Sequence, residues 1–165
     1  MKTSIHLLIM ACIVAGCGSR VPAPDTPAQR AETVRQITDK VETTRDGTST
    51  ASNIDTYKRD LANRISEVNS IKVYAGRPQA LLRSVIVVKY TIDAGGGHVR
   101  SEIVRSNRDR ANEATALASI KSTAPFPKPA EHLLRSGRVD VTETWLFNND
   151  GRFQLRTIAQ KQLDE

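Results

Sequence analysis

The sequence has no cysteine beyond residue 17 and few aromatic or histidine side chains. Its 165 residues include two cysteines, three histidines and one tryptophan. Beyond residue 17 this scarcity excludes disulfides, thiolate zinc sites and cysteine–histidine nucleophile pairs. No G-x-S-x-G or H-E-x-x-H motif occurs either. We therefore expect a protein that is not an enzyme, with no catalytic residue, no cofactor and no metal site.

The longest apolar run lies at the N-terminus and is too short to span a membrane. Lys2 precedes an apolar stretch from Ile5 to Val14, and the small residues Ala15 and Gly16 follow. A basic start, a core of about ten apolar residues and a small-residue end are typical of a secretory signal peptide. A spanning helix needs roughly 18 or more apolar residues. The alternative is a buried N-terminal helix of a cytosolic protein, but polar, proline-bearing sequence follows at once.

The tetrapeptide VAGC at residues 14–17 resembles the lipobox of bacterial lipoproteins. In that family the cysteine thiol carries a diacylglycerol, and the precursor is cut just before it. The resemblance implies that residues 1–16 form a lipoprotein signal peptide and that Cys17 is the lipid attachment site, which anchors the protein to a membrane. Gly18 follows, where lipoproteins kept in the inner membrane often carry aspartate. The resemblance therefore implies the periplasmic face of the outer membrane.

The net charge of +6 suits anionic counter-surfaces. Nucleic acid is one such partner, but an exported lipoprotein meets little of it. We expect no nucleic-acid binding. Anionic lipid, peptidoglycan or acidic segments of envelope proteins remain as partners.

Residues 17–52 have the composition expected of a tether. Three prolines lie between residues 22 and 27, and small polar residues close the segment. Val34, Ile37 and Val41 fall at helical spacing, which predicts a short helix within an otherwise flexible linker.

From residue 53 the pattern becomes that of one α+β domain, residues 53–165. Apolar residues on one helical face predict a helix over 53–69, with Asn53 as its N-cap. Alternating or β-branched runs predict strands, and the glycines of AGGG (94–97) predict a tight reversal between two of them. A phosphate-binding loop is the alternative there, but the spacing of such loops is absent. The expected strands are 84–93, 98–106, 138–147 and 152–158, and a second helix is expected at 109–124 with Ala111, Ala114, Leu117 and Ala118 on one face.

This order predicts a small antiparallel sheet of order 2-1-3-4 with two helices packed on one face. The segments YTIDAGGGHV, EATALASIKSTAPFPKP and VDVTETWLF resemble the C-terminal domain of the TonB family over about residues 53–147. The helix opening IDTYKRDLANRI is similar to the related TolA domain. The resemblance implies a non-enzymatic envelope protein whose terminal strand pairs with a partner peptide. TonB and TolA begin with a transmembrane helix that couples them to an ion-driven motor. This chain has the expected lipid anchor instead, so we expect the binding fold without direct energy coupling.

The resemblance places partner binding at a sheet edge. The turn sequence NNDG and the alternating RFQLRTI predict that residues 152–158 pair with 139–147 and occupy this edge from within the molecule. The tail would then be either a lid or a new binding edge. The expected partner-binding residues are Val139, Asp140, Val141, Thr142, Glu143, Thr144, Arg152, Gln154 and Arg156.

Three functions follow as hypotheses. The first is a lipid-anchored module that binds a peptide or envelope protein and assists transport or envelope integrity. The second is a structural lipoprotein without a peptide ligand, which self-associates through sheet edges. The third is a binder of peptidoglycan or lipid phosphate, with a basic set comprising Arg100, Arg105, Arg108 and Arg110.

Overall fold

The computed structural model describes residues 26–160, so the expected signal peptide and Cys17 lie outside the described residues. No helix in this described part is long and apolar enough to cross a membrane.

The described residues form helices, two short 3-10 turns and strands. In chain order the elements are α1 (Pro27–Ile37), α2 (Ile54–Val68), the 3-10 turn η1 (Ser70–Lys72), β1 (Ser84–Asp93), β2 (His98–Arg105), α3 (Arg110–Thr123), the 3-10 turn η2 (Glu131–Leu133), β3 (Arg138–Phe147) and β4 (Phe153–Leu155).

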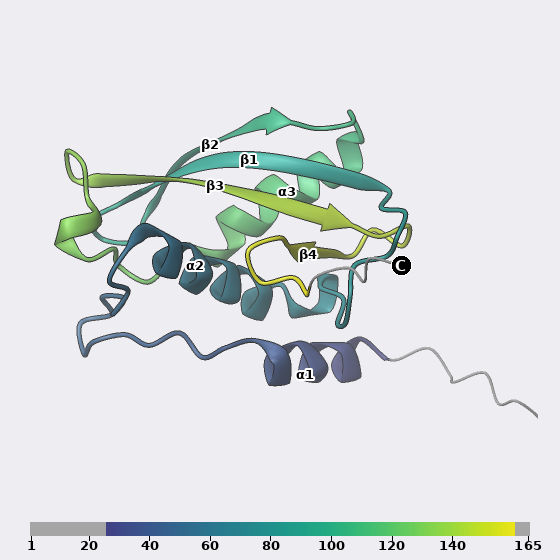
Figure 1. Cartoon of the computed structure of the whole chain (residues 1–165), viewed down its shortest axis with the longest axis horizontal. Coiled ribbons are helices and arrows are strands. Elements are labelled where there is room, and N and C mark those ends of the chain that lie inside the picture. Colours follow the sequence, from purple (N-terminus) through teal and green to yellow (C-terminus); the bar gives the residue numbers. More distant parts are fainter. Residues whose placement is uncertain (1–25, 161–165) are drawn as a thin grey trace, which may run out of the picture.

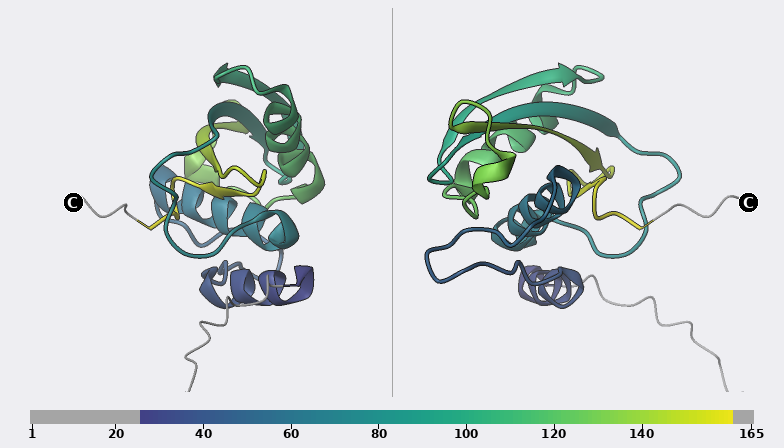
Figure 2. Two further views of the ribbon diagram at one scale, coloured as in Figure 1. Left: turned by 90° about the vertical axis from the view of Figure 1, so that its right-hand side faces the viewer. Right: turned by 60° about the vertical axis from the view of Figure 1, so that its left-hand side comes forward.

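The strands form one antiparallel sheet in the order β2-β1-β3-β4, which confirms the predicted α+β class and strand order. Helices α2 and α3 pack on the same face of this sheet and touch each other (Figures 1 and 2). The opposite face carries no helix among the described residues. Strand β1 lies between β2 and β3, so both of its edges are paired.

The core lies between the sheet and the two helices. Alternate residues of β1 and β3 point into it, because side chains of a strand alternate between faces. Trp145 is fully buried, meets the ring of Tyr90 edge-on at 6.5 Å, and donates its indole N–H to Ser119 Oγ at 3.1 Å. This hydrogen bond satisfies the indole N–H, which would otherwise be buried without a partner.

Helix α2 begins where the sequence predicts. Asn53 accepts a hydrogen bond from the Thr56 N–H at 2.9 Å, and Thr56 Oγ1 accepts one from the Asn53 N–H. The two residues form a reciprocal cap. Tyr57, Leu61 and Ile65 are buried, and the Tyr57 hydroxyl donates to the Pro127 carbonyl at 2.7 Å.

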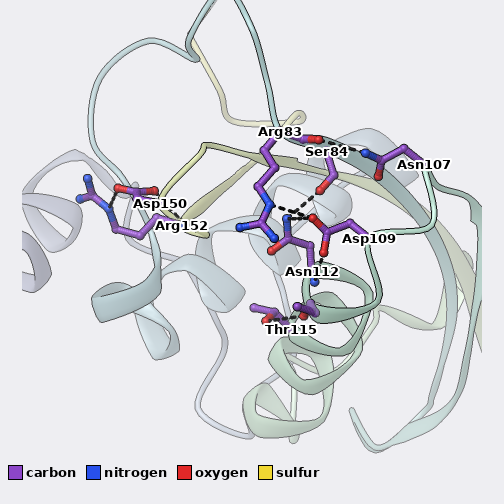
Figure 3. Close-up of polar contacts among 9 residues, drawn as sticks. Arg83, Ser84, Asn107, Asp109, Asn112, Thr115, Asp150 and Arg152 are labelled. Atoms are coloured by element: carbon purple, nitrogen blue, oxygen red, sulfur yellow. Dashed lines mark hydrogen bonds and ion pairs between the residues drawn. The ribbon is translucent and has the colours of Figure 1, made fainter.

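Helix α3 turns a different face inward from the predicted one. Of the predicted face, Leu117 packs partly buried against the core, but Ala111, Ala114 and Ala118 are not buried. The buried residues are instead Asn112, Ala116, Ser119, Ile120 and Thr123. The polar residues are tolerated inside because they are hydrogen-bonded. Figure 3 shows one such set at the start of the helix, where Asn112 Nδ2 donates to Ser84 Oγ at 2.7 Å and Arg83 Nε contacts the N-cap residue Asp109 at 2.8 Å. The prediction failed because hydrophobicity alone favoured the alanine face.

The described part of the segment expected to be a flexible tether, residues 26–52, is ordered. Helix α1 packs against α2 and η1 on the side away from the sheet (Figure 2), and Val34 is only 1% exposed. Further along, the Ser49 N–H donates to the Lys128 carbonyl at 2.8 Å, and Ala51 is buried. Part of the predicted 17–52 linker is therefore attached to the domain through buried apolar contacts and main-chain hydrogen bonds.

Candidate functional site

The C-terminal tail covers only one end of β3. Strand β4 pairs with Trp145, Leu146 and Phe147, and the Arg156 N–H adds a hydrogen bond to the Thr144 carbonyl at 2.9 Å. The chain then turns, with the N–H of Ile158 donating to the Leu155 carbonyl. The prediction that residues 152–158 pair along all of 139–147 is therefore wrong in its extent. In Figure 1, β4 accompanies the right-hand part of β3 only.

The tail is also not a detachable lid. Phe153 and Leu155 are fully buried, and Phe153 packs against Phe147 with ring centroids 5.7 Å apart. Gln154 Nε2 donates to the carbonyls of Tyr74 and Gly76, both at 2.7 Å. The Tyr74 N–H donates to the Phe153 carbonyl at 3.2 Å, so the outer side of β4 is engaged as well. Neither predicted role of the tail, lid or new binding edge, fits these contacts.

The remaining part of β3 has an open edge, which consists of the main-chain groups of Asp140 and Thr142. The Thr144 carbonyl faces the tail, and alternate residues of a strand face the same side. Asp140 and Thr142 therefore direct their N–H and C=O groups to this side as well. Within the described residues, no group hydrogen-bonds to them there. At the start of the strand, Arg138 is paired with Arg135 in a tight turn.

A groove of about 890 Å³ lies beside the start of this open edge. It is bounded by the beginning of α2, by η2 and by the first residues of β3. Ile54, which is 40% exposed, contributes apolar surface to it, together with Leu133 and Leu134. Arg100, Arg135, Arg138 and His132 also line it, against the single acidic residue Asp140. The groove is therefore partly apolar, and its lining carries more basic than acidic side chains.

Asp140, the one carboxylate that lines the groove, already has charge and hydrogen-bond partners in the sheet. The Thr91 hydroxyl donates to Asp140 Oδ1 at 2.6 Å, and Lys89 Nζ lies 3.1 Å from Oδ2. The Thr91 hydrogen bond, followed by the one from Lys89, lowers the pKa of Asp140. Arginine charge in the groove therefore remains available to an acidic ligand.

Glu143 is a buried carboxyl on the core-facing side of β3. Its side chain lies among Tyr90, Lys58 of α2 and Thr157 of the tail, and its Oε1 accepts the Thr144 N–H at 2.6 Å. Burial raises the pKa of Glu143, although hydrogen bonds from Thr157 and Thr144 and the charge of Lys58 oppose the rise. Because this side chain points inward, Glu143 is not itself exposed for partner contact.

Glu143→Gln should stabilise the protein at neutral pH. A raised folded-state pKa means that the folded protein binds the proton more tightly than the unfolded chain does. The contribution of Glu143 to the free energy of unfolding is therefore greatest below its ordinary pKa of 4.5, and it falls as the pH rises above that value. The amide removes this loss. We expect Tm to rise by about 2–4 °C at pH 7, and the difference to disappear near pH 4. Glu131→Gln, at an exposed glutamate of η2, is the control and should leave Tm unchanged at both pH values. Equal pH profiles for Glu143→Gln and wild type would contradict the assignment.

The other predicted site residues are dispersed. Val139 and Val141 point into the core, Thr144 is half-buried beside the tail, and Gln154 is buried and bonded. Arg152 is held by Asp150 at 2.6 Å (Figure 3), and Arg156 is exposed beyond β4. The structure thus narrows the predicted edge to Asp140 and Thr142. Sequence reasoning missed the groove residues Ile54, Leu133, Arg135 and Arg138, because they come from three separate segments.

The basic set proposed for phosphate binding is not one cluster. Arg100 and Arg105 are five residues apart on β2, roughly 16 Å at ~3.3 Å per residue. Arg108 and Arg110 follow in the loop and at the start of α3, beyond the Arg105 end. Arg100 belongs instead to the groove.

Among the described residues, no group of three or more histidine, cysteine, aspartate or glutamate side chains could hold a metal ion. Comparison with family profiles, curated proteins and solved structures finds no match to this chain.

Proposed function

We propose that this chain is a lipid-anchored protein of the bacterial cell envelope that binds an extended segment of a partner protein as an added strand beside β3. The anchor rests on the lipobox resemblance at Cys17, and the envelope role on the resemblance to TonB and TolA domains. In this role the protein assists transport or the integrity of the envelope from the periplasmic face of the outer membrane.

The observation that supports strand addition best is the open edge at Asp140 and Thr142. Unpaired main-chain donors and acceptors at a sheet edge are a template for another strand. The gap is short, since the Arg135–Arg138 turn limits it at one end and the tail at the other. A ligand therefore needs only a brief extended stretch. The cationic groove beside the gap favours acidic side chains in that ligand, and Ile54 favours an apolar one.

The test displays short random peptides and selects those that bind the full chain, in which Cys12 and Cys17 are replaced by serine. Selected peptides should be β-prone and acidic. Thr142→Pro should weaken their binding at least about tenfold, because it deletes an outward-facing N–H without removing a hydrogen bond to β1. Thr142→Val retains the N–H and should bind as the parent does. Fluorescence anisotropy with a selected peptide gives both affinities.

The alternatives make different predictions. Equal binding of the peptide by Thr142→Pro and the parent would rule out strand addition at this edge. Binding to peptidoglycan or to vesicles of phosphatidylglycerol, unaffected by Thr142→Pro and lost at high salt, would support the phosphate- or glycan-binding function. Selection of no peptide would favour a structural lipoprotein.

A further inference from the structure

Among the described residues nothing pairs with the opposite edge of the sheet, which is formed by β2. Strand β2 pairs with β1 on one side only and ends the sheet order. It forms the upper rim of the sheet in Figure 1, with no element beyond it. Val99 is 41% exposed and Val104 60% exposed on this strand. Such an edge can pair with another strand unless something opposes it.

The hydrogen-bonding pattern fixes which residues of β2 face outward. Since Thr144 faces the tail, its neighbour Glu143 faces β1, and its partner there, Val88, faces β3. The next residue, Lys89, therefore faces β2, and its partner Glu102 faces β1. Ser101 and Ile103, on either side of Glu102, consequently direct their main-chain N–H and C=O groups to the free edge.

The sequence of β2 is complementary to itself in one antiparallel register. With Ser101 opposite Ser101 of a second copy, Arg100 lies opposite Glu102 on the outer face, and two-fold symmetry forms this pair twice. Val99 then lies opposite Ile103. Moving the axis by one residue keeps the outward-facing groups in line, but it places Glu102 against Glu102 or Arg100 against Arg100. Opposite charges across strands stabilise pairing and like charges oppose it, so charge favours the Ser101 register over these two neighbouring ones.

Both charges are available for this contact. Neither Arg100 nor Glu102 forms an ion pair with another of the described residues, since Lys89, which is opposite Glu102, pairs with Asp140 instead. In the single chain the Arg100 Nε donates to the Thr91 hydroxyl of β1 at 3.3 Å, so the guanidinium leans toward β1 on the outer face. Pairing with Glu102 of a second copy exchanges this long hydrogen bond for an ion pair.

We propose that two copies of this chain join through β2, antiparallel and centred on Ser101, into one continuous sheet. The inference uses the opposite edge from the proposed strand addition, and Arg100 is the one residue that the groove and the dimer share. Both β3 edges remain at the two ends of the joined sheet. A dimer therefore presents two open edges, and a partner with two binding segments gains avidity without new contacts.

Cross-linking at residue 101 tests this pairing. In the full chain with Cys12 and Cys17 replaced by serine, Ser101→Cys should give a disulfide-linked dimer under mild oxidation. Directly opposite Cα atoms are about 5.5 Å apart in a hydrogen-bonded pair, within the range of about 4.4–6.8 Å that a disulfide needs. Val104→Cys is the control, because residue 104 lies roughly 20 Å from its own copy in this register. Its cross-linking should be at least tenfold less.

Charge reversal then tests the register. On the Ser101→Cys background, Arg100→Glu alone or Glu102→Arg alone should reduce the dimer at least tenfold, since each places like charges opposite one another. The double variant Arg100→Glu/Glu102→Arg restores opposite charges and should recover the parental yield. A monomeric Ser101→Cys protein, equal cross-linking at residue 104, or single reversals without effect would each overturn the proposal. Recovery in the double variant separates a broken interface from a misfolded strand.

Discussion

Val88→Asp should leave the domain unfolded at 25 °C. Val88 is fully buried on the central strand β1, with its side chain turned toward the helices. A carboxylate there has no partner, and burying an unpaired charge costs several kcal/mol or forces the carboxyl to remain protonated. A domain of this size is stable by only about 5–15 kcal/mol. Circular dichroism and urea unfolding at pH 7 measure the loss.

Val87→Asp provides the matched control for this experiment. It introduces the same side chain one residue earlier on the same strand, but Val87 is half-buried on the face that no helix covers. We expect it to fold, with a loss of about 1 kcal/mol. Wild-type melting of Val88→Asp, or equal losses in the two variants, would show that the two faces of β1 are not distinguished as described.

Short-range patterns predicted most of the fold. The Asn53 cap, the β-branched run of β1 and the alternation of β3 are local features, and the short connections between successive strands predicted which of them are neighbours in the sheet. The inward face of α3 was mispredicted because Asn112 and Ser119 look like surface residues until Ser84 and Trp145 supply their partners. Those partners are distant in sequence, so no local pattern contains them.

The sequence predicted that residues 138–147 form a strand, but not which part of that strand has an unpaired edge. Whether Asp140 and Thr142 are paired depends on where the tail leaves β3, and that is set by the packing of Ile158 and by the segment at Val73 and Tyr74 that closes β4. The docking of helix α1 on the domain likewise depends on the burial of Val34 against elements far along the chain. Each of these outcomes is a balance of tertiary contacts, which helical or strand periodicity does not report.

Gly96→Ala should destabilise the domain by several kcal/mol, because this glycine of the hairpin turn is itself buried against Phe126. Gly96 has φ +84°, a conformation that costs an alanine about 1–2 kcal/mol. In addition, a Cβ at this position would lie 2.2 Å from the Phe126 carbonyl oxygen. The Phe126 N–H donates to the Gly96 carbonyl at 2.8 Å, so the two backbones cannot separate without losing that bond. Phe126 is itself buried and stacks on Tyr90 with centroids 6.0 Å apart, which carries the displacement into the core.

Gly47→Ala isolates the contribution of this close approach. Gly47 has the same φ of +84°, but nothing lies within 4 Å of its added Cβ. The two variants therefore carry the same backbone strain, and only Gly96→Ala also meets the Phe126 carbonyl. Urea unfolding should show a loss of about 1–2 kcal/mol for Gly47→Ala and a clearly larger one for Gly96→Ala. Equal losses would mean that the hairpin moves away from Phe126 without cost. In that case the glycines of AGGG would serve the reversal alone, as the sequence first indicates.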